Sequence, residues 1–194
     1  HIYLIGNLIK QCKEIIDKIT DIIQNQTHYY THHALYSQYY RISLQYFKVI
    51  GDPQKYLESA LKFLTHTKAR DLPKEEQLLF GSDICLAALL SHQCYNFSVL
   101  LSHELIQLLH KTTYDWLLQI ISIFNTGDLA RWKSYCLRNG KLLKEHETIS
   151  HNLAFLEQKI RLMALIELVF QTPSHERLIT FELISRKCQL QIDE

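Results

Sequence analysis

The spacing of apolar residues is helical along almost the whole chain. In the first segment, residues 2–24, apolar side chains such as Cys12, Ile15 and Ile19 recur at intervals of three, four and seven, which places them on one face of an α-helix. No alternation typical of a strand appears before Arg177. The same period predicts helices over residues 2–24, 29–50, 56–65, 73–91, 99–110, 114–124, 129–137 and 149–170. The chain is therefore expected to be mainly α.

Turn signals divide these helices into pairs. Gly51 can end one helix, Asp52 can cap the next, and Pro53 suits a first turn. The segment around them, YFKVIGDPQKYLESAL, is loosely similar to SIFNTGDLARWKSYCL, in which Gly127-Asp128 is the same kind of turn signal. Asn139-Gly140 is expected to end the helix that follows. A loose repeat of helix pairs predicts a right-handed α-solenoid of helical hairpins, similar to tetratricopeptide repeats.

The last forty residues follow a different order. A long apolar helix, NLAFLEQKIRLMALIELVF, leads through a proline to a strand-like RLITF and a new helix, ELISRKCQ. Helix, short strand and helix form the first half of a winged-helix unit, so we expect a helical-repeat arm over residues 1–147 and a linking helix with an incomplete winged-helix subdomain over 148–194. The missing second half and the start at His1 lead us to expect a fragment of a larger protein. From Leu162 to Phe170 the helix is apolar nearly all round, which predicts burial on several sides.

Composition and charge narrow the classes of partner. The net charge of +1 provides no general field for nucleic acid or an anionic membrane. The five cysteines are scattered and form no CxxC pair, which favours reduced thiols in the cytoplasm and nucleus. Residues 22–40 and 84–103 lack Asp, Glu, Lys and Arg, but both runs contain His, Gln and Asn that would be costly in lipid. We therefore expect buried helices and no membrane span.

Two clusters could in principle carry chemistry. His28 and His32 or His33 could share a helix face, but a zinc site needs further ligands, and the chain has no HExxH. His92, Cys94 and His103 form the second cluster. We interpret the first cluster as structural or solvent-facing histidines and the second as a packed helix turn, and we expect no metal and no cofactor.

A cysteine nucleophile is the enzymatic alternative. Cys85 or Cys94 could pair with His103, but both thiols lie in apolar sequence, which raises a thiol pKa and suppresses reactivity. No glycine-rich phosphate loop accompanies them. We expect no catalytic residues.

A run of tyrosines has two possible uses. At helical spacing such a stripe usually belongs to a core, although aromatic residues also line peptide-binding grooves. The core is the favoured interpretation of Tyr29, Tyr30, Tyr36, Tyr39, Tyr40 and Tyr46.

The winged-helix part could contact either DNA or protein. Its basic residues Arg177, Arg186 and Lys187 are offset by nearby acids, and no basic stripe follows, so DNA binding is the weaker hypothesis. A strand edge can instead pair with a neighbouring subunit. The predicted protein-interface residues are Arg177, Leu178, Ile179, Thr180 and Phe181.

Several motifs occur in an order that is found in a known family. They include YLESALKFL, DLP-x-x-EQ, LAALL-x-x-x-x-YNF, T-x-YDWLL, FN-x-GD and L-x-QKI-x-LMALIE-x-VF. In these motifs the chain resembles the PCI-domain subunits of the 26S proteasome lid over roughly residues 39–194. It departs from the family pattern at Ser91, at Ser98-Val99 and at Glu104.

This resemblance implies a scaffold without catalytic activity. Its expected partners are other PCI-domain lid subunits, the lid deubiquitinase pair and a ubiquitin receptor, in support of ubiquitin-dependent protein degradation. Two alternatives stay open, namely a PCI subunit of the COP9 signalosome or translation initiation factor three, and a winged-helix protein that binds nucleic acid.

Overall fold

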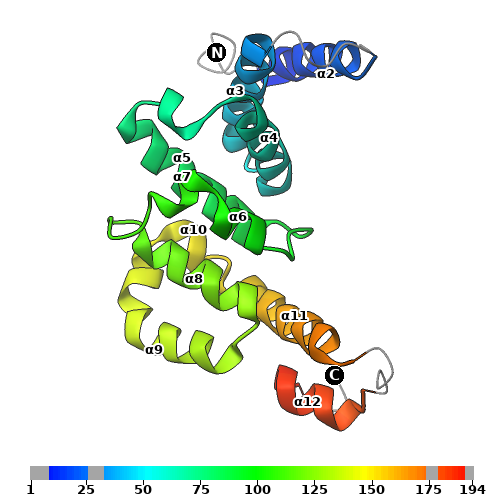
Figure 1. Cartoon of the computed structure of the whole chain (residues 1–194), viewed down its shortest axis with the longest axis vertical. Coiled ribbons are helices and arrows are strands. Elements are labelled where there is room, and N and C mark those ends of the chain that lie inside the picture. Colours follow the sequence, from blue (N-terminus) through cyan, green and yellow to red (C-terminus); the bar gives the residue numbers. More distant parts are fainter. Residues whose placement is uncertain (1–8, 26–32, 174–178, 191–194) are drawn as a thin grey trace. The chain divides into compact units, whose positions relative to one another are not determined.

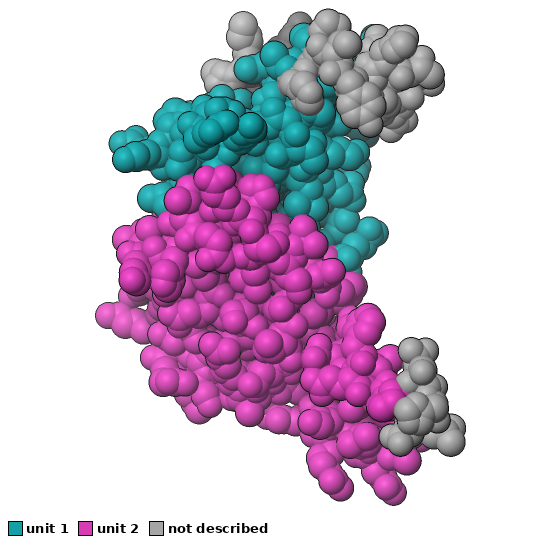
Figure 2. Space-filling model, viewed as in Figure 1, with its two compact units in different colours: residues 1–93 teal, residues 94–194 magenta. Residues whose placement is uncertain are grey.

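The computed structural model describes residues 9–25, 33–173 and 179–190, and every regular element within them is a helix (Figure 1). The mainly α prediction is therefore confirmed. The chain forms two compact units, residues 1–93 and residues 94–194 (Figure 2). The domain boundary predicted after residue 147 falls inside the second unit and stays a prediction.

Unit 1 is built on a helical hairpin. Gly51, with φ +76°, ends the first helix of the hairpin, and Asp52 caps the second by accepting a 3.0 Å hydrogen bond from the Lys55 N–H. The predicted turn chemistry is thus confirmed, and α4 then packs against α5. The elements are α2 (Ile9–Asn25), α3 (His33–Ile50), α4 (Pro53–His66), a 3₁₀ turn η1 (Ala69–Asp71) and α5 (Lys74–Leu90).

The tyrosine stripe of α3 belongs to the core of unit 1. Tyr36 and Tyr40 are buried and stack on the His66 ring of α4, with centroids 5.1 and 5.9 Å apart. Tyr46 is buried with Cys12 and Ile16 of α2. The core interpretation is confirmed for α3, whereas the first two tyrosines of the run, at positions 29 and 30, lie outside the described residues.

Unit 2 contains a second Gly-Asp turn between two helices. Gly127, with φ +59°, ends α8, and Asp128 caps α9 by accepting a 2.9 Å hydrogen bond from the Arg131 N–H. The helix α8 contacts α6, α9 and α11, and α12 packs against α11. The elements are α6 (Ser98–Ser102), α7 (Glu104–Gln107), α8 (Asp115–Thr126), α9 (Leu129–Glu145), α10 (Glu147–Ser150), α11 (Leu153–Gln171) and α12 (Phe181–Cys188).

Two helix boundaries differ from the prediction. The single helix expected over residues 99–110 is broken at His103, whose backbone is extended and whose Nδ1 accepts a 3.1 Å hydrogen bond from the Leu105 N–H. The break predicted at Asn139-Gly140 is confirmed in part. Asn139 leaves the helical region (φ −111°, ψ 21°), and its amide donates to the Tyr135 carbonyl at 3.2 Å, but α9 resumes after this kink and runs to Glu145.

The strand predicted over residues 177–181 does not form where the structure describes it. Arg177 and Leu178 lie outside the described residues, Ile179 and Thr180 are irregular, and Phe181 begins α12. The Thr180 hydroxyl accepts a 3.3 Å hydrogen bond from the Leu183 N–H. This N-cap accounts for the error, because Thr and Phe favour strands only in a suitable tertiary context.

The linking helix α11 is not buried all round, contrary to prediction. Ile160, Met163 and Leu168 face the core of unit 2, but Phe170 is 82% exposed. The mixed result arises because the described elements of unit 2 cover α11 only in part. Within the described residues no helix is long and apolar enough to cross a membrane.

Candidate functional site

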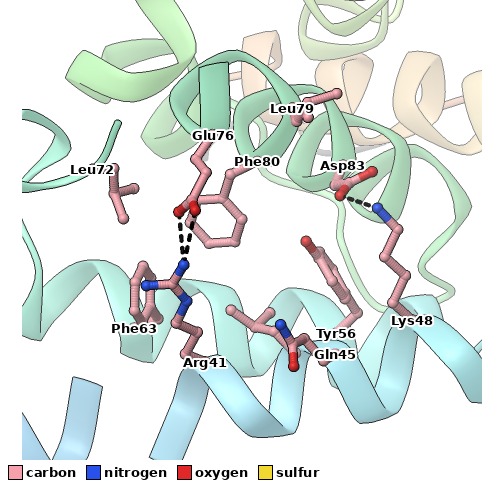
Figure 3. A pocket seen from close by; sticks show the side chains of 11 residues that line it. Arg41, Gln45, Lys48, Tyr56, Phe63, Leu72, Glu76, Leu79, Phe80 and Asp83 are labelled. Carbon is pink, nitrogen blue, oxygen red and sulfur yellow. Dashed lines mark hydrogen bonds and ion pairs between the residues drawn. The ribbon is translucent and has the colours of Figure 1, made fainter. Parts of the chain in front are cut away.

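A hollow of about 300 Å³ lies on unit 1 among α3, α4 and α5, and we name it the α3–α5 groove (Figure 3). Its floor is apolar, with Leu44, Phe63 and Phe80 among the lining side chains. The Phe63 and Phe80 rings meet edge to face with centroids 5.2 Å apart, a favourable aromatic geometry. The groove therefore offers an apolar surface of the kind that binds small ligands or a partner's side chain.

Two ion pairs cross the groove from α3 to α5. Arg41 Nη2 donates to both carboxylate oxygens of Glu76, at 3.0 and 2.8 Å, and Lys48 pairs with Asp83 (Figure 3). The two cations are seven residues apart on α3, and the two anions are seven residues apart on α5. Each pair is partly exposed, so each stabilises unit 1 by about 1 kcal/mol at most.

Tyr56 closes one end of the floor. The side chain is buried, and burial together with the negative charge of Asp83 raises the pKa of the Tyr56 hydroxyl well above its usual range. It therefore stays a neutral phenol at physiological pH. Apolar side chains and charges that are already paired line the groove, which is therefore suited to binding.

Unit 2 contains a buried lysine that is surrounded by aromatic rings. Lys159 of α11 is 2% exposed, and its ammonium lies 5.3 Å from the centroid of the Phe97 ring and 5.8 Å from those of Tyr95 and Phe155. Burial lowers the pKa of Lys159 to about 8, and Cys94 opposes that shift. Cation–π contacts compensate part of the cost of burying the charge.

The histidines do not assemble into a metal site among the described residues, in which no group of three or more potential metal ligands occurs. His28 and His32 lie outside the described residues, and the side chain of His33 is not described. His103 is engaged in the α7 cap.

The two cysteines considered as nucleophiles, Cys85 and Cys94, are held as protonated thiols. Cys85 is fully buried in α5, and burial raises its pKa to about 12. Burial also raises the pKa of Cys94, against the opposing charge of Lys159. A thiolate is the reactive form of cysteine, so neither thiol is activated as a nucleophile.

The groove residues Arg41, Lys48, Glu76 and Asp83 were missed by sequence reasoning. Their signal is the shared spacing of seven, with both cations on one helix and both anions on another. It becomes informative only once α3 and α5 are known to flank the same surface. The Lys159 site left no comparable signal, since its three rings come from two separate segments.

Paired helices and turn caps of one repeated type define the class, which is a helical-repeat protein. Residues 1–121 match the family described as PSD13 N-terminal repeats, and the chain belongs to that family.

Relatives extend the similarity across the chain. It is 27% identical over 190 residues to 26S proteasome non-ATPase regulatory subunit 13 of Dictyostelium discoideum, covering 98% of this chain and 49% of that protein. Identity is 31% over 186 residues to homolog A of that subunit in Arabidopsis thaliana, covering 95% and 47%. It is 32% over 193 residues to the probable 26S proteasome regulatory subunit rpn9 of Schizosaccharomyces pombe, covering 100% and 49%.

The chain thus spans about half the length of the curated relatives it matches. The resemblance to proteasome regulatory subunits is confirmed. The motifs of this chain resemble those of the ninth non-ATPase regulatory subunit, in agreement with the name of the fission yeast relative.

Proposed function

We propose that this chain belongs to a non-catalytic scaffold subunit of the 26S proteasome lid, which supports ubiquitin-dependent protein degradation. The observation that carries this proposal is the similarity to proteasome regulatory subunits across 95–100% of the chain.

The proposed architecture is a right-handed α-solenoid that leads into a winged-helix PCI unit. Support comes from the two capped turns at Gly51 and Gly127 and from the family description, which names repeats. The pairing of α11 with α12 supplies two helices of the proposed PCI unit.

The proposed partners are other PCI-domain lid subunits, the lid deubiquitinase pair and a ubiquitin receptor, in the cytoplasm and nucleus. The proposed contact includes Ile179, Thr180 and Phe181, together with the two residues before them. Phe181 is 81% exposed at the start of α12, and an exposed aromatic side chain is well suited to anchor a protein contact.

Affinity isolation of the full-length protein, with identification of the proteins recovered, tests the proposal. Recovery of lid and 20S components is expected. Recovery of signalosome or initiation-factor subunits instead would reassign the scaffold to a sister complex, and recovery of neither would overturn the scaffold role.

A variant addresses the contact itself. Phe181→Asp is expected to reduce recovery of lid subunits without unfolding the protein, because the side chain is exposed. Val99→Asp, at another exposed apolar position, is the matched control. Equal recovery with both variants would remove Phe181 from the proposed interface.

A further inference from the structure

The helices α8 and α9 pack together in unit 2 (Figure 1). Residues of both line a second hollow, which we name the α8–α9 groove. Its volume is about 450 Å³. Gln119 and Ile123 line it from α8, and Arg131, Tyr135, Arg138 and Asn139 line it from α9. Unlike the α3–α5 groove, it presents two cations and no carboxylate in its lining.

Arg131 and Arg138 give this groove its charge. They are seven residues apart, so both lie on one face of α9, separated by about 10 Å along its axis. Neither guanidinium forms a salt bridge with a carboxylate among the described residues, where the ion pairs involve other cations. The helix as a whole carries five basic side chains and one acidic side chain.

Regular helix fixes the spacing of the two arginines along α9. The Arg138 Nε donates to the Ser134 carbonyl at 3.2 Å, and the Tyr135 hydroxyl between the arginines donates to the Trp116 carbonyl at 3.3 Å. The kink of α9 comes at Asn139, directly after the second arginine. The segment that carries both cations is therefore regular helix. The distance between the Cα atoms of the two arginines is thus fixed before a ligand binds.

We propose that the α8–α9 groove binds an acidic segment of a partner protein through two carboxylates about 10 Å apart. A guanidinium offers a planar fork that matches a carboxylate with two hydrogen bonds. In a polyproline II segment three residues complete one turn and span about 9 Å, so acidic residues three positions apart lie on one face and match the spacing of the two arginines. The recognised pattern is Glu-x-x-Glu or its Asp equivalents in a polyproline II segment.

Charge distribution favours a protein ligand over nucleic acid. A nucleic-acid surface needs a longer basic track that follows successive phosphates. Here the groove supplies two cations in a chain of net charge +1. This inference does not depend on the scaffold proposal, because the groove is complete within unit 2.

Fluorescence anisotropy with labelled synthetic peptides tests the proposal on the whole chain. The probe is Gly-Glu-Leu-Ala-Glu-Gly. The comparison peptides carry Gln in place of both Glu residues, or place the two Glu residues side by side. Saturable binding of the probe, at least about tenfold tighter than that of either comparison peptide, is expected. Absence of saturable binding at about 1 mM peptide would overturn the proposal.

Paired variants locate the binding. R131E/R138E is expected to weaken binding of the probe by about tenfold or more. K141E/K144E makes the same change of charge at exposed positions on the same helix and is expected to change it by less than about twofold. R131K/R138K keeps the charge but loses the fork and is expected to be intermediate. R131Q/R138Q, followed by circular dichroism, separates loss of charge from loss of fold.

Three results would count against the groove. Equal weakening by K141E/K144E would mean diffuse attraction to α9, and equal binding of both acidic peptides would remove the spacing rule. Tighter binding of a short oligothymidine than of the probe would make phosphate, and not a protein carboxylate, the ligand.

Discussion

Gly127 is the position at which a single added methyl group is expected to disturb unit 2 most. It ends α8 with φ +59°, and a Cβ built there would lie 2.7 Å from the Cα and N of Ala164 in α11. Those atoms are backbone and cannot rotate away. We therefore predict that Gly127→Ala separates the α8–α9 turn from α11.

Two costs add at this position. Placing a residue with a Cβ in the left-handed region lowers the free energy of unfolding by about 1–2 kcal/mol. Forcing a methyl group into a close backbone contact costs about 1–3 kcal/mol more. The expected loss of about 2–5 kcal/mol is large compared with the stability of a typical domain, which is about 5–15 kcal/mol.

The other glycines separate these two costs. Gly51 also has a positive φ, of +76°, but an added Cβ there would meet nothing within 4 Å, so Gly51→Ala is expected to lose only about 1–2 kcal/mol. Asn tolerates the left-handed region better than Ala, so Gly51→Asn is expected to be nearly neutral. Gly127→Asn keeps the clash and is expected to remain strongly destabilised.

The third glycine gives a control of opposite sign within unit 2. Gly140 lies in α9 with open space around it, so Gly140→Ala is expected to stabilise by about 0.5–1 kcal/mol.

Urea unfolding can be followed for unit 2 alone, because Trp116 and Trp132 are the two tryptophans of the chain and both lie there. The Gly127 and Gly140 variants are compared by tryptophan fluorescence, and the Gly51 variants by far-ultraviolet circular dichroism. If Gly127→Asn were as stable as the wild type, the close approach to Ala164 would be wrong. If Gly127→Ala lost no more than Gly51→Ala, the backbone angle alone would account for the glycine.

Three further predictions follow from burial and capping. Because the pKa of Lys159 falls from 10.5 to about 8 on folding, the unfolded chain binds more protons between those pH values. The stability of the wild type relative to Lys159→Met should therefore rise by up to about 3 kcal/mol from about pH 8 to 10.5, and a constant difference in urea unfolding would contradict this. Cys85, with its pKa raised to about 12, should resist a thiol reagent at about pH 8 until urea unfolds the chain, and rapid labelling of the native chain at Cys85 would contradict its burial. Asp52→Ala should lower the free energy of unfolding by about 1 kcal/mol, and Asp52→Asn should leave it almost unchanged, as measured by circular dichroism. Equal losses in the two variants would refute the capping role.

The turns were the most predictable part of the fold. Gly51-Asp52-Pro53 and Gly127-Asp128 carry local chemistry, a left-handed glycine followed by a capping carboxylate, and the structure bears out both. The rule held only in part at Asn139-Gly140, where the Asn139 backbone leaves the helical region but α9 resumes after the kink.

The candidate sites were less predictable because they depend on packing. The sequence does not say that α3 and α5 flank one surface, so the charges at Arg41 and Glu76 look like unrelated surface residues. The aromatic surroundings of Lys159 likewise require α11 to meet a loop more than sixty residues earlier in the chain. Periodicity identifies the buried face of a helix but not the element that covers it.

The FN-x-GD motif joins these two levels. Phe124 is fully buried, with its ring centroid 5.2 Å from that of Trp132 and 6.1 Å from that of Phe97. Gly127 supplies the turn and the approach to Ala164, and Asp128 caps α9. Phe124, Gly127 and Asp128 thus each meet a different physical requirement of packing, backbone angle or capping. Together they determine how α8, α9 and α11 pack against one another.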